Sequence, residues 1–230
     1  MHLIIFVLIF CFVLFLFKLY HLAVDDYVLI KKNISIENVF NVAFVCSIVA
    51  LFSARLIFVI FNFSTNFLNP LVFVLFPYFP GLSLVGGLLG SAFFLLIYSR
   101  YKKFPTGRIF DFFTIAFLFS LPPGLVGFIL LSSRFSQGEL VELILFVLLS
   151  VLTSLYLYPK ASSLEIKDGS LSMLFVIFYS LITLLSNSID NSGIKNFIAN
   201  GENFILISLL ISGVALIIRQ EIAGRINFEK

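Results

Sequence analysis

The residue best suited to bind or do chemistry in this sequence is Arg55, which stands inside the apolar run Leu51–Phe58. A guanidinium inside a membrane span costs at least a few kcal/mol unless it is paired or reaches water. We expect Arg55 to meet an anionic lipid phosphate or a carboxylate. The alternative is that it snorkels to the lipid headgroups, with only its methylene stem in the apolar layer.

A second candidate feature is a run of small residues, Ser83-Leu-Val-Gly-Gly-Leu-Leu-Gly90. Because glycine has no side chain, Gly86 and Gly87 would let a ligand approach the backbone closely, which makes both of them candidate lipid-binding residues. The spacing of Gly86 and Gly90 is equally typical of close helix–helix packing. The sequence leaves both interpretations open.

Polar residues also gather near residue 137, where an apolar segment begins. Arg134, Gln137, Glu139 and Glu142 lie within nine residues of one another. Arg134 and Gln137 are candidates for binding a lipid headgroup. The alternative is an ordinary helix start, at which Glu139 and Glu142 interact favourably with the helix dipole.

The residue sets of common catalytic sites are missing from the sequence. His2 and His21 are the only histidines, and they do not belong to a metal-ligand cluster. There is also no phosphate-binding loop and no Gly-x-Ser-x-Gly motif. We therefore predict no metal and no cofactor, and the residues by themselves identify no catalytic group.

The composition indicates the kind of protein that must position these side chains. Of 230 residues, 60% are hydrophobic, 12% are charged and 31 are phenylalanine, whereas about a quarter of the residues in a soluble domain are charged. A soluble fold would leave long apolar helix faces in water. The sequence therefore predicts a protein embedded in a membrane.

Seven segments are long and apolar enough to cross a bilayer, which takes about 20 residues of helix. Because backbone groups inside lipid need partners within the chain, we expect helices. The sequence thus predicts an all-α bundle forming a single transmembrane domain over residues 1–230, with no soluble domain. The predicted spans are Leu3–Ala23, Val39–Phe61, Gly81–Tyr98, Ile109–Leu131, Leu140–Tyr158, Leu171–Ser188 and Asn203–Ile218.

Prolines mark two irregular places in this pattern. Asn69–Pro80 is apolar but holds three prolines and is too short to cross, so it is either a re-entrant segment or a plain loop. Pro122-Pro123-Gly124 falls within the fourth span and predicts an interruption there. That interruption is either a kink beside a binding site or a packed bend.

The basic residues predict the direction of the spans. They concentrate in alternate loops, and positive residues favour the cytoplasmic side. This places the N-terminus outside and the C-terminus inside. Because the net charge of only +3 is spread over these loops, it gives no indication of nucleic-acid binding. The basic residues on the predicted inner side are Lys18, Lys31, Lys32, Arg100, Lys102, Lys103, Arg108, Lys160, Lys167, Arg219, Arg225 and Lys230.

The first apolar segment is expected to remain in the protein as a span. It lacks the basic start of a secretory signal, and Lys18 follows the apolar run instead. Cys11 follows the large Phe10, which is unsuited to lipoprotein processing, and Cys46 lies in another apolar segment. We therefore expect no disulfide between the two cysteines.

Taken in order, several segments resemble the prolipoprotein diacylglyceryl transferase family. Ser53-Ala-Arg-Leu-Ile-Phe-Val-Ile-Phe-Asn62 is similar to the family's Gly-Gly-Arg-x-Gly-Tyr-Val-Leu-Phe-Tyr. Val85-Gly-Gly-Leu-Leu-Gly90, after Asn69-Pro-Leu71, is similar to its His-Gly-Gly-Leu-x-Gly, which follows Asp-Pro-Leu. Tyr98–Lys103 and Asp111-Phe-Phe resemble the family's basic loop and the start of its following span. Arg134-Phe-Ser-Gln137 is similar to its His-Pro-Ser-Gln, and Asp168–Asp190 resembles its sixth span.

The sequence also departs from the family's pattern. Val85 stands where the family has histidine, and Pro122–Phe128 stands where it has Gly-Arg-x-Gly-Asn-Phe. The sixth span lacks the family's Arg and Glu, although Thr183 and Ser186 are nearby. About fifty residues of an outer head region are missing between Leu131 and Arg134.

The resemblance implies seven spans and transfer of diacylglyceryl from phosphatidylglycerol to the cysteine thiol of a prolipoprotein. The expected partners are thus an anionic phospholipid and a prolipoprotein signal peptide. Such a reaction needs a cation on the phosphate and a group that takes the thiol proton. Arg55 matches the first requirement and no residue matches the second, so a non-catalytic lipid-binding or assembly protein stays open as an alternative. A transporter or channel subunit would need more polar residues in its spans.

Overall fold

The computed structural model describes residues 2–24, 26–63, 67, 72–73, 81–131, 136–163, 165–190, 197 and 200–222. Over these residues the fold is all-helical, and seven helices are long and apolar enough to cross a membrane. Both predictions are confirmed. The spans are α1 (His2–Ala23), α3 (Ile36–Phe61), α5 (Leu84–Tyr101), α6 (Thr106–Leu131), α7 (Gln137–Leu152) with η2 (Thr153–Leu157) and α8 (Tyr158–Ser162), α9 (Ser170–Asp190), and α11 (Gly201–Ile217) with η3 (Ile218–Ile222).

Polar side chains cap the starts of several helices and shift them from the predicted limits. The side-chain oxygens of Ser35, Ser83, Ser136 and Asn200 accept hydrogen bonds from backbone N–H groups in the first turns of α3, α5, α7 and α11. These N–H groups have no partner within the helix itself. As a result α3, α7 and α11 begin before the predicted apolar runs, whereas α5 begins at Leu84, after the predicted start at Gly81.

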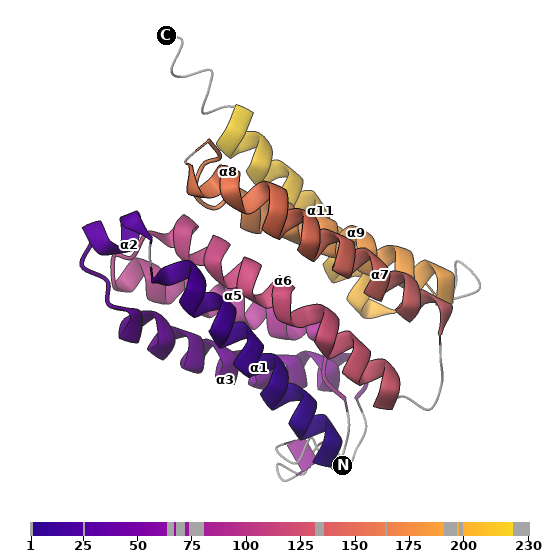
Figure 1. The fold of residues 1–230 in the computed structure, drawn as a ribbon. Coiled ribbons are helices and arrows are strands. Elements are labelled where there is room, and N and C mark those ends of the chain that lie inside the picture. Colours follow the sequence, from indigo (N-terminus) through magenta and orange to yellow (C-terminus); the bar gives the residue numbers. More distant parts are fainter. Residues whose placement is uncertain are drawn as a thin grey trace.

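The helices form two groups (Figure 1). In the first group α1 packs along α6 and α3 packs along α5; in the second group α9 packs between α7 and α11. Contacts of α6 with α7 and α9 join the two groups. Side chains from both groups fill the space between them and form one apolar cluster. It includes Val85 of α5 and Leu121 of α6 from the first group, and Phe146 of α7, Tyr179 of α9 and Leu206 of α11 from the second.

Large apolar side chains cover much of the outer surface. Phe6, Phe93, Leu130 and Leu155 are each more than 65% exposed. This pattern runs along all seven helices and far exceeds the apolar patches of soluble proteins. The exposed apolar surface is therefore the surface that contacts lipid.

At Pro122–Gly124, where the sequence predicts an interruption of the fourth span, α6 stays helical through both prolines; the kink and the packed bend stay predictions. Proline removes one backbone donor, but neighbouring structure can accommodate it in a membrane helix. Glycines on the same helix let α1 approach closely. A side chain at Gly127 would come within 2.5 Å of Val7, and one at Gly124 would come within 3.2 Å of Cys11.

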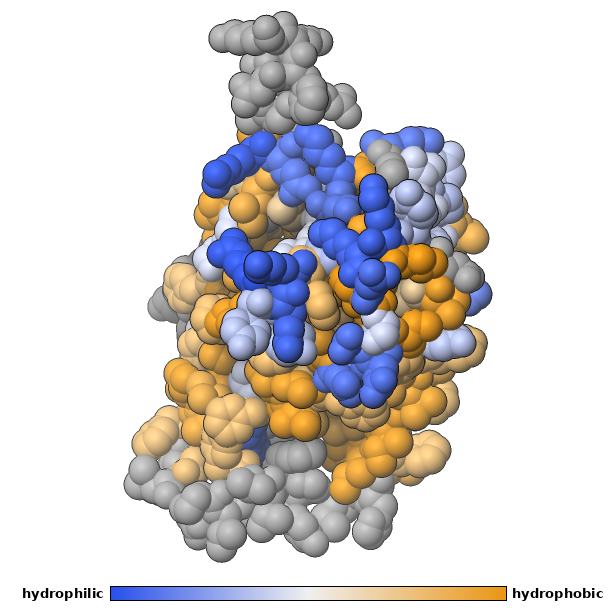
Figure 2. All heavy atoms as spheres, turned by 90° about the vertical axis from the view of Figure 1, so that its left-hand side faces the viewer, coloured by the Kyte–Doolittle hydropathy of each residue, from blue (hydrophilic) through white to orange (hydrophobic). Residues whose placement is uncertain are grey.

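The basic connections all lie at one end of the bundle, which we call the basic end. It carries α2 (Tyr27–Lys31), the turn between α5 and α6, and α8 with the turn before α9. Figure 2 shows hydrophilic residues gathered on this face above a hydrophobic area. Arg55 and the start of α7 lie at the other end, which we call the opposite end. That the basic end faces the cytoplasm stays a prediction of its charge.

A buried ion pair holds the basic end together. Arg108, in the first turn of α6, donates to Asp26 Oδ2 from Nε (3.0 Å) and Nη2 (2.7 Å). Its Nη1 donates to the carbonyl oxygen of Ala161 (2.8 Å) and lies 3.3 Å from Asp168 Oδ1. Asp26 also caps α2, accepting from the N–H of Leu29. Arg108 thus links α2 and α6 of one group to α8 and the start of α9 in the other.

Asp111, one turn further along α6, makes a second link between the groups. Its Oδ2 accepts from the N–H of Gly169 (2.7 Å) and its Oδ1 from the N–H of Ser172 (2.9 Å). The carboxylate therefore caps α9 from another helix, where negative charge is favourable. Gly107 makes this approach possible, because a side chain there would come within 2.6 Å of the carbonyl oxygen of Asp168.

We expect Arg108→Met to lower the free energy of unfolding by about 3–5 kcal/mol, because the change leaves Asp26 buried and unpaired. Arg100→Met removes the same charge from an exposed position at the same end and should change stability by no more than about 0.5 kcal/mol. Denaturant titration of both variants in mixed micelles measures the difference. Equal effects would show that net charge, and not the buried pair, stabilises this end.

Candidate functional site

The guanidinium of Arg55 is buried at the opposite end, with the side chain only 2% exposed. It donates to three backbone carbonyls: Nε to Phe73 (3.2 Å), Nη2 to Val72 (3.0 Å) and Nη1 to Gly81 (2.8 Å). This burial contradicts the snorkelling alternative. Arg55 instead attaches backbone that follows α3 to the body of the bundle. Most of the predicted re-entrant segment Asn69–Pro80 lies outside the described residues.

The positive charge of Arg55 has neutral surroundings. Its guanidinium carbon lies 5.1 Å from the ring centre of Phe67 and 5.7 Å from that of Phe58, which is cation–π geometry. Among the described residues, no carboxylate lies within ion-pair distance of it; both ion pairs found there belong to Arg108. Carbonyl oxygens and aromatic faces carry only partial negative charge. A full negative charge is therefore still missing from this site.

Ser83 fixes the start of α5 beside Arg55. Its N–H donates to the carbonyl oxygen of Ala54, the residue before the arginine (3.0 Å), and its Oγ accepts from the N–H of Gly86 (3.1 Å). Gly81, which accepts from Arg55, has a φ of +146° that favours glycine. The N-terminus of α5, the Gly81 turn and Arg55 are thus held together as one unit.

Gly86 and Gly87 face α3 and differ in the space around them. A side chain at Gly86 would come within 2.6 Å of Ile57 Cβ and 2.9 Å of the Ser53 carbonyl oxygen. At Gly87 the nearest atoms would be 3.4 Å or more away. Gly90 also abuts Ser53. The glycines therefore bring α5 close to α3, and this packing positions the loop that Arg55 holds.

The polar residues at the start of α7 lie in the other helix group. Gln137 is exposed at the first position of α7 and makes no hydrogen bond or ion pair with Arg55. Arg134 lies outside the described residues. The cap of α7 comes from Ser136 and from Asp190 of α9, whose Oδ1 accepts from the N–H of Gly138 (2.8 Å). Sequence analysis missed Asp190 as a partner because it is 52 residues away.

Val85, at the position where the family has histidine, is 2% exposed. It belongs to the apolar cluster that includes Leu121 of α6, Phe146 of α7 and Leu206 of α11. A valine side chain has no proton to take or give. The part of the structure around position 85 is therefore packed as a core.

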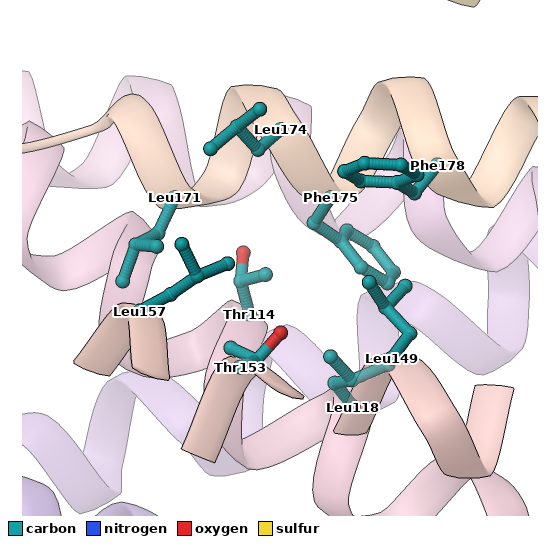
Figure 3. Close-up of a pocket in the computed structure, with 9 residues that line it drawn as sticks. All are labelled: Thr114, Leu118, Leu149, Thr153, Leu157, Leu171, Leu174, Phe175 and Phe178. Atoms are coloured by element: carbon teal, nitrogen blue, oxygen red, sulfur yellow. The ribbon is translucent and has the colours of Figure 1, made fainter. Parts of the chain in front are cut away.

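A narrow crevice lies between α6, α7, η2 and α9, away from Arg55 (Figure 3). Only two hydroxyl groups, those of Thr114 and Thr153, interrupt its apolar lining. Its wall includes η2, a π-helical turn that ends two residues before Pro159. Because proline has no N–H, it cannot donate a hydrogen bond to the preceding turn, and the regular α-helical pattern is interrupted there. The lining offers no charge for a headgroup. It consists of Thr114, Leu118, Leu149, Thr153, Leu157, Leu171, Leu174, Phe175 and Phe178.

Comparison with known proteins supports the family resemblance. The family model for prolipoprotein diacylglyceryl transferase matches residues 3–130, which is more than half of the chain. The match runs from α1 almost to the end of α6, and so covers Arg55 and the small residues of α5. No curated protein matches the chain.

We expect Gly86→Ala to destabilise the protein by about 1–3 kcal/mol, because the added methyl group would push α5 away from Ile57 and Ser53. Gly87→Ala is the matched control, one residue away. It has room for the methyl group and should be neutral, or stabilising by up to about 1 kcal/mol through helix propensity. Thermal unfolding in detergent compares the two. The same loss in both variants would contradict the close contact at Gly86.

Proposed function

This chain belongs to the prolipoprotein diacylglyceryl transferase family, and we propose that it is a lipid-binding member that holds an anionic phospholipid headgroup beside Arg55. The observation that supports this most directly is the buried guanidinium with no carboxylate partner among the described residues. A buried charge needs compensation, and a phosphate diester supplies one full negative charge.

The lipid we propose is a phosphatidylglycerol-like phospholipid, the donor that the family uses. Three of the five N–H donors of Arg55 are occupied by described carbonyls. In our proposal the remaining N–H groups of the guanidinium donate to a phosphate oxygen, which is a favourable charge-assisted pairing. Gly86 and Gly87 contribute indirectly by keeping α5 against α3. Gln137 and Arg134 remain proposed contacts to the headgroup from the other helix group.

Diacylglyceryl transfer would require more than a phosphate clamp. The bond between the glyceryl carbon and the phosphate oxygen must break while a carbon–sulfur bond forms, and a base must take the thiol proton. Position 85 carries a buried valine among apolar neighbours. We therefore propose binding without transfer. The family match favours transfer as the second candidate function, with a prolipoprotein signal peptide as the other substrate.

The proposed setting is a bacterial plasma membrane with the basic end inside. In this orientation the Arg55 site lies toward the outer leaflet, where the start of α5 meets the lipid. The seven membrane-length helices support multi-pass insertion, and the basic connections support the direction.

Substituting Arg55 with Met should weaken binding of phosphatidylglycerol by about 10- to 100-fold, because one charge-assisted hydrogen bond contributes about 1.5–3 kcal/mol. Native mass spectrometry with phosphatidylglycerol and phosphatidylcholine measures the preference. Arg55→Lys keeps the charge and should retain part of that preference. Arg100→Met, which removes an exposed charge at the basic end, should retain all of it. Unchanged lipid preference in Arg55→Met would rule out the proposed site.

A thiol-lipidation assay separates binding from transfer. The protein is reconstituted with phosphatidylglycerol and a prolipoprotein peptide, and the mass of the peptide cysteine is followed. We expect no diacylglyceryl adduct under conditions in which an active family member modifies the peptide. An adduct that is lost in Arg55→Met would instead establish the transferase function and overturn the proposal of binding alone.

A further inference from the structure

A group of polar side chains lies inside the second helix group, between α7 and α9. We call it the α7–α9 polar cluster and define it as Glu139, Glu142, Tyr179, Thr183 and Ser186. Glu142 lies five residues into α7, about 8 Å along the helix, and its Oε1 accepts from Thr183 Oγ1 (3.2 Å). Ser186, which is buried, also faces this carboxylate.

Two buried atoms of the cluster lack a partner within the described part of the chain. Tyr179 is 1% exposed, and its hydroxyl faces Glu142 and Thr183 without meeting hydrogen-bond geometry to any described group. Glu139 Oε2 is buried and accepts no hydrogen bond there. Buried polar atoms normally have partners. Two such atoms around one carboxylate are therefore available to a partner from outside the chain.

On the side of α9 that faces α11, the polar side chains of Asn187 and Asn203 have hydrogen-bond partners, as buried polar groups usually do. Asn187 Nδ2 donates to Asn203 Oδ1 of α11 (2.8 Å), and Asn203 Nδ2 donates to the carbonyl oxygen of Phe197 (2.8 Å). The amide of Asn203 is thus used both as an acceptor and as a donor. Two of the three buried side-chain atoms without a partner among the described residues, Tyr179 Oη and Glu139 Oε2, thus lie between α9 and α7, and the third is Ser99 Oγ of α5.

The charge around the cluster is negative. Glu139 and Asp190 both repel Glu142, and Glu202 at the start of α11 acts on Tyr179 in the same sense. No Lys, Arg or His among the described residues lies within ion-pair distance of any of these carboxylates. Buried like charges oppose one another. A positive charge taken up from outside would relieve both the repulsion and the missing hydrogen-bond partners.

We propose that the α7–α9 polar cluster binds a small monovalent cation, with Glu142 supplying the charge and the hydroxyls of Tyr179, Thr183 and Ser186 supplying neutral oxygens. These three hydroxyls recur at a spacing of four and three residues and therefore share one face of α9. Hard cations prefer such all-oxygen surroundings. One carboxylate with three neutral hydroxyl oxygens carries a single negative charge, which matches a singly charged ion.

Sodium is the probe that tests this site. The unfolding midpoint of the full-length protein is measured in an uncharged detergent, in chloride salts of sodium, potassium and N-methyl-D-glucamine at constant ionic strength. Sodium should raise the midpoint saturably, by about 5 °C or more at ~100 times its dissociation constant. Direct binding of radiolabelled sodium to the same preparation should saturate over the same concentration range.

Matched variants assign the effect to the cluster. Glu142→Gln keeps the size of the side chain and should abolish both the sodium-dependent shift and the binding. Tyr179→Phe removes only the orphan hydroxyl and should weaken sodium binding about tenfold without preventing folding. Glu165→Gln, an exposed carboxyl at the basic end, should behave as the unmodified protein does.

An unchanged midpoint in sodium and N-methyl-D-glucamine, with no bound radiolabel, would overturn the proposal. In that case a proton or a basic side chain of the chain itself would supply the missing charge. Sodium binding that persists in both Glu142→Gln and Tyr179→Phe would overturn it equally. None of these outcomes bears on lipid binding at Arg55, which lies in the other helix group and is tested separately.

Discussion

Every charge that this chain places inside its apolar helices must be compensated, either by the protein itself or by a bound ligand, because hydrocarbon offers neither water nor counterions. The two buried arginines meet this constraint in different ways. Arg108 is paired with Asp26 and lies 3.3 Å from Asp168, so its charge is neutralised inside the fold. Arg55 meets only carbonyl oxygens and aromatic rings among the described residues. The same residue type therefore has a structural role at one end and an incomplete environment at the other.

This difference distinguishes the basic end, which polar links hold together, from the opposite end, where two of the three unsatisfied buried side-chain atoms of the described residues lie. At the basic end, the links made by Arg108 and Asp111 cross between the two helix groups, and Lys167 Nζ also donates to the carbonyl oxygen of Gln220. At the opposite end, the contacts between groups are mainly apolar and include Val85 and Tyr179. Removing polar links is costly where the partner stays buried. Ligand binding therefore fits the opposite end better, because Tyr179 Oη and Glu139 Oε2 lack described partners there, whereas the basic end has only the Ser99 hydroxyl in that condition.

The seven spans could be predicted from sequence because each depends on a continuous apolar run, and their predicted limits fell within a few residues of the helices. The site could be predicted only in part. Arg55 stood out because it is a charge within a span, but its carbonyl partners lie 17 to 26 residues away in a segment with no regular pattern. Arg108 was interpreted as a loop charge that marks topology, since nothing local indicates a partner 82 residues away. At Pro122 and Pro123 the sequence predicted an interruption, and α6 stays helical through both residues.

The opposite end carries positive and negative charge in separate helix groups. Arg55 lies in α3, whereas Glu142 lies in α7, and the described structure forms no ion pair between them. The apolar cluster around Val85, Phe146 and Leu206 fills the space where the two groups meet. Because apolar side chains neither donate nor accept hydrogen bonds, this core leaves no path for a direct polar link between Arg55 and Glu142. In our two proposals each side chain is therefore paired with a ligand from outside the fold, and the signs of the two ligands differ. An anionic headgroup suits the Arg55 side and a cation suits the Glu142 side, so one apolar core separates two sites of opposite charge.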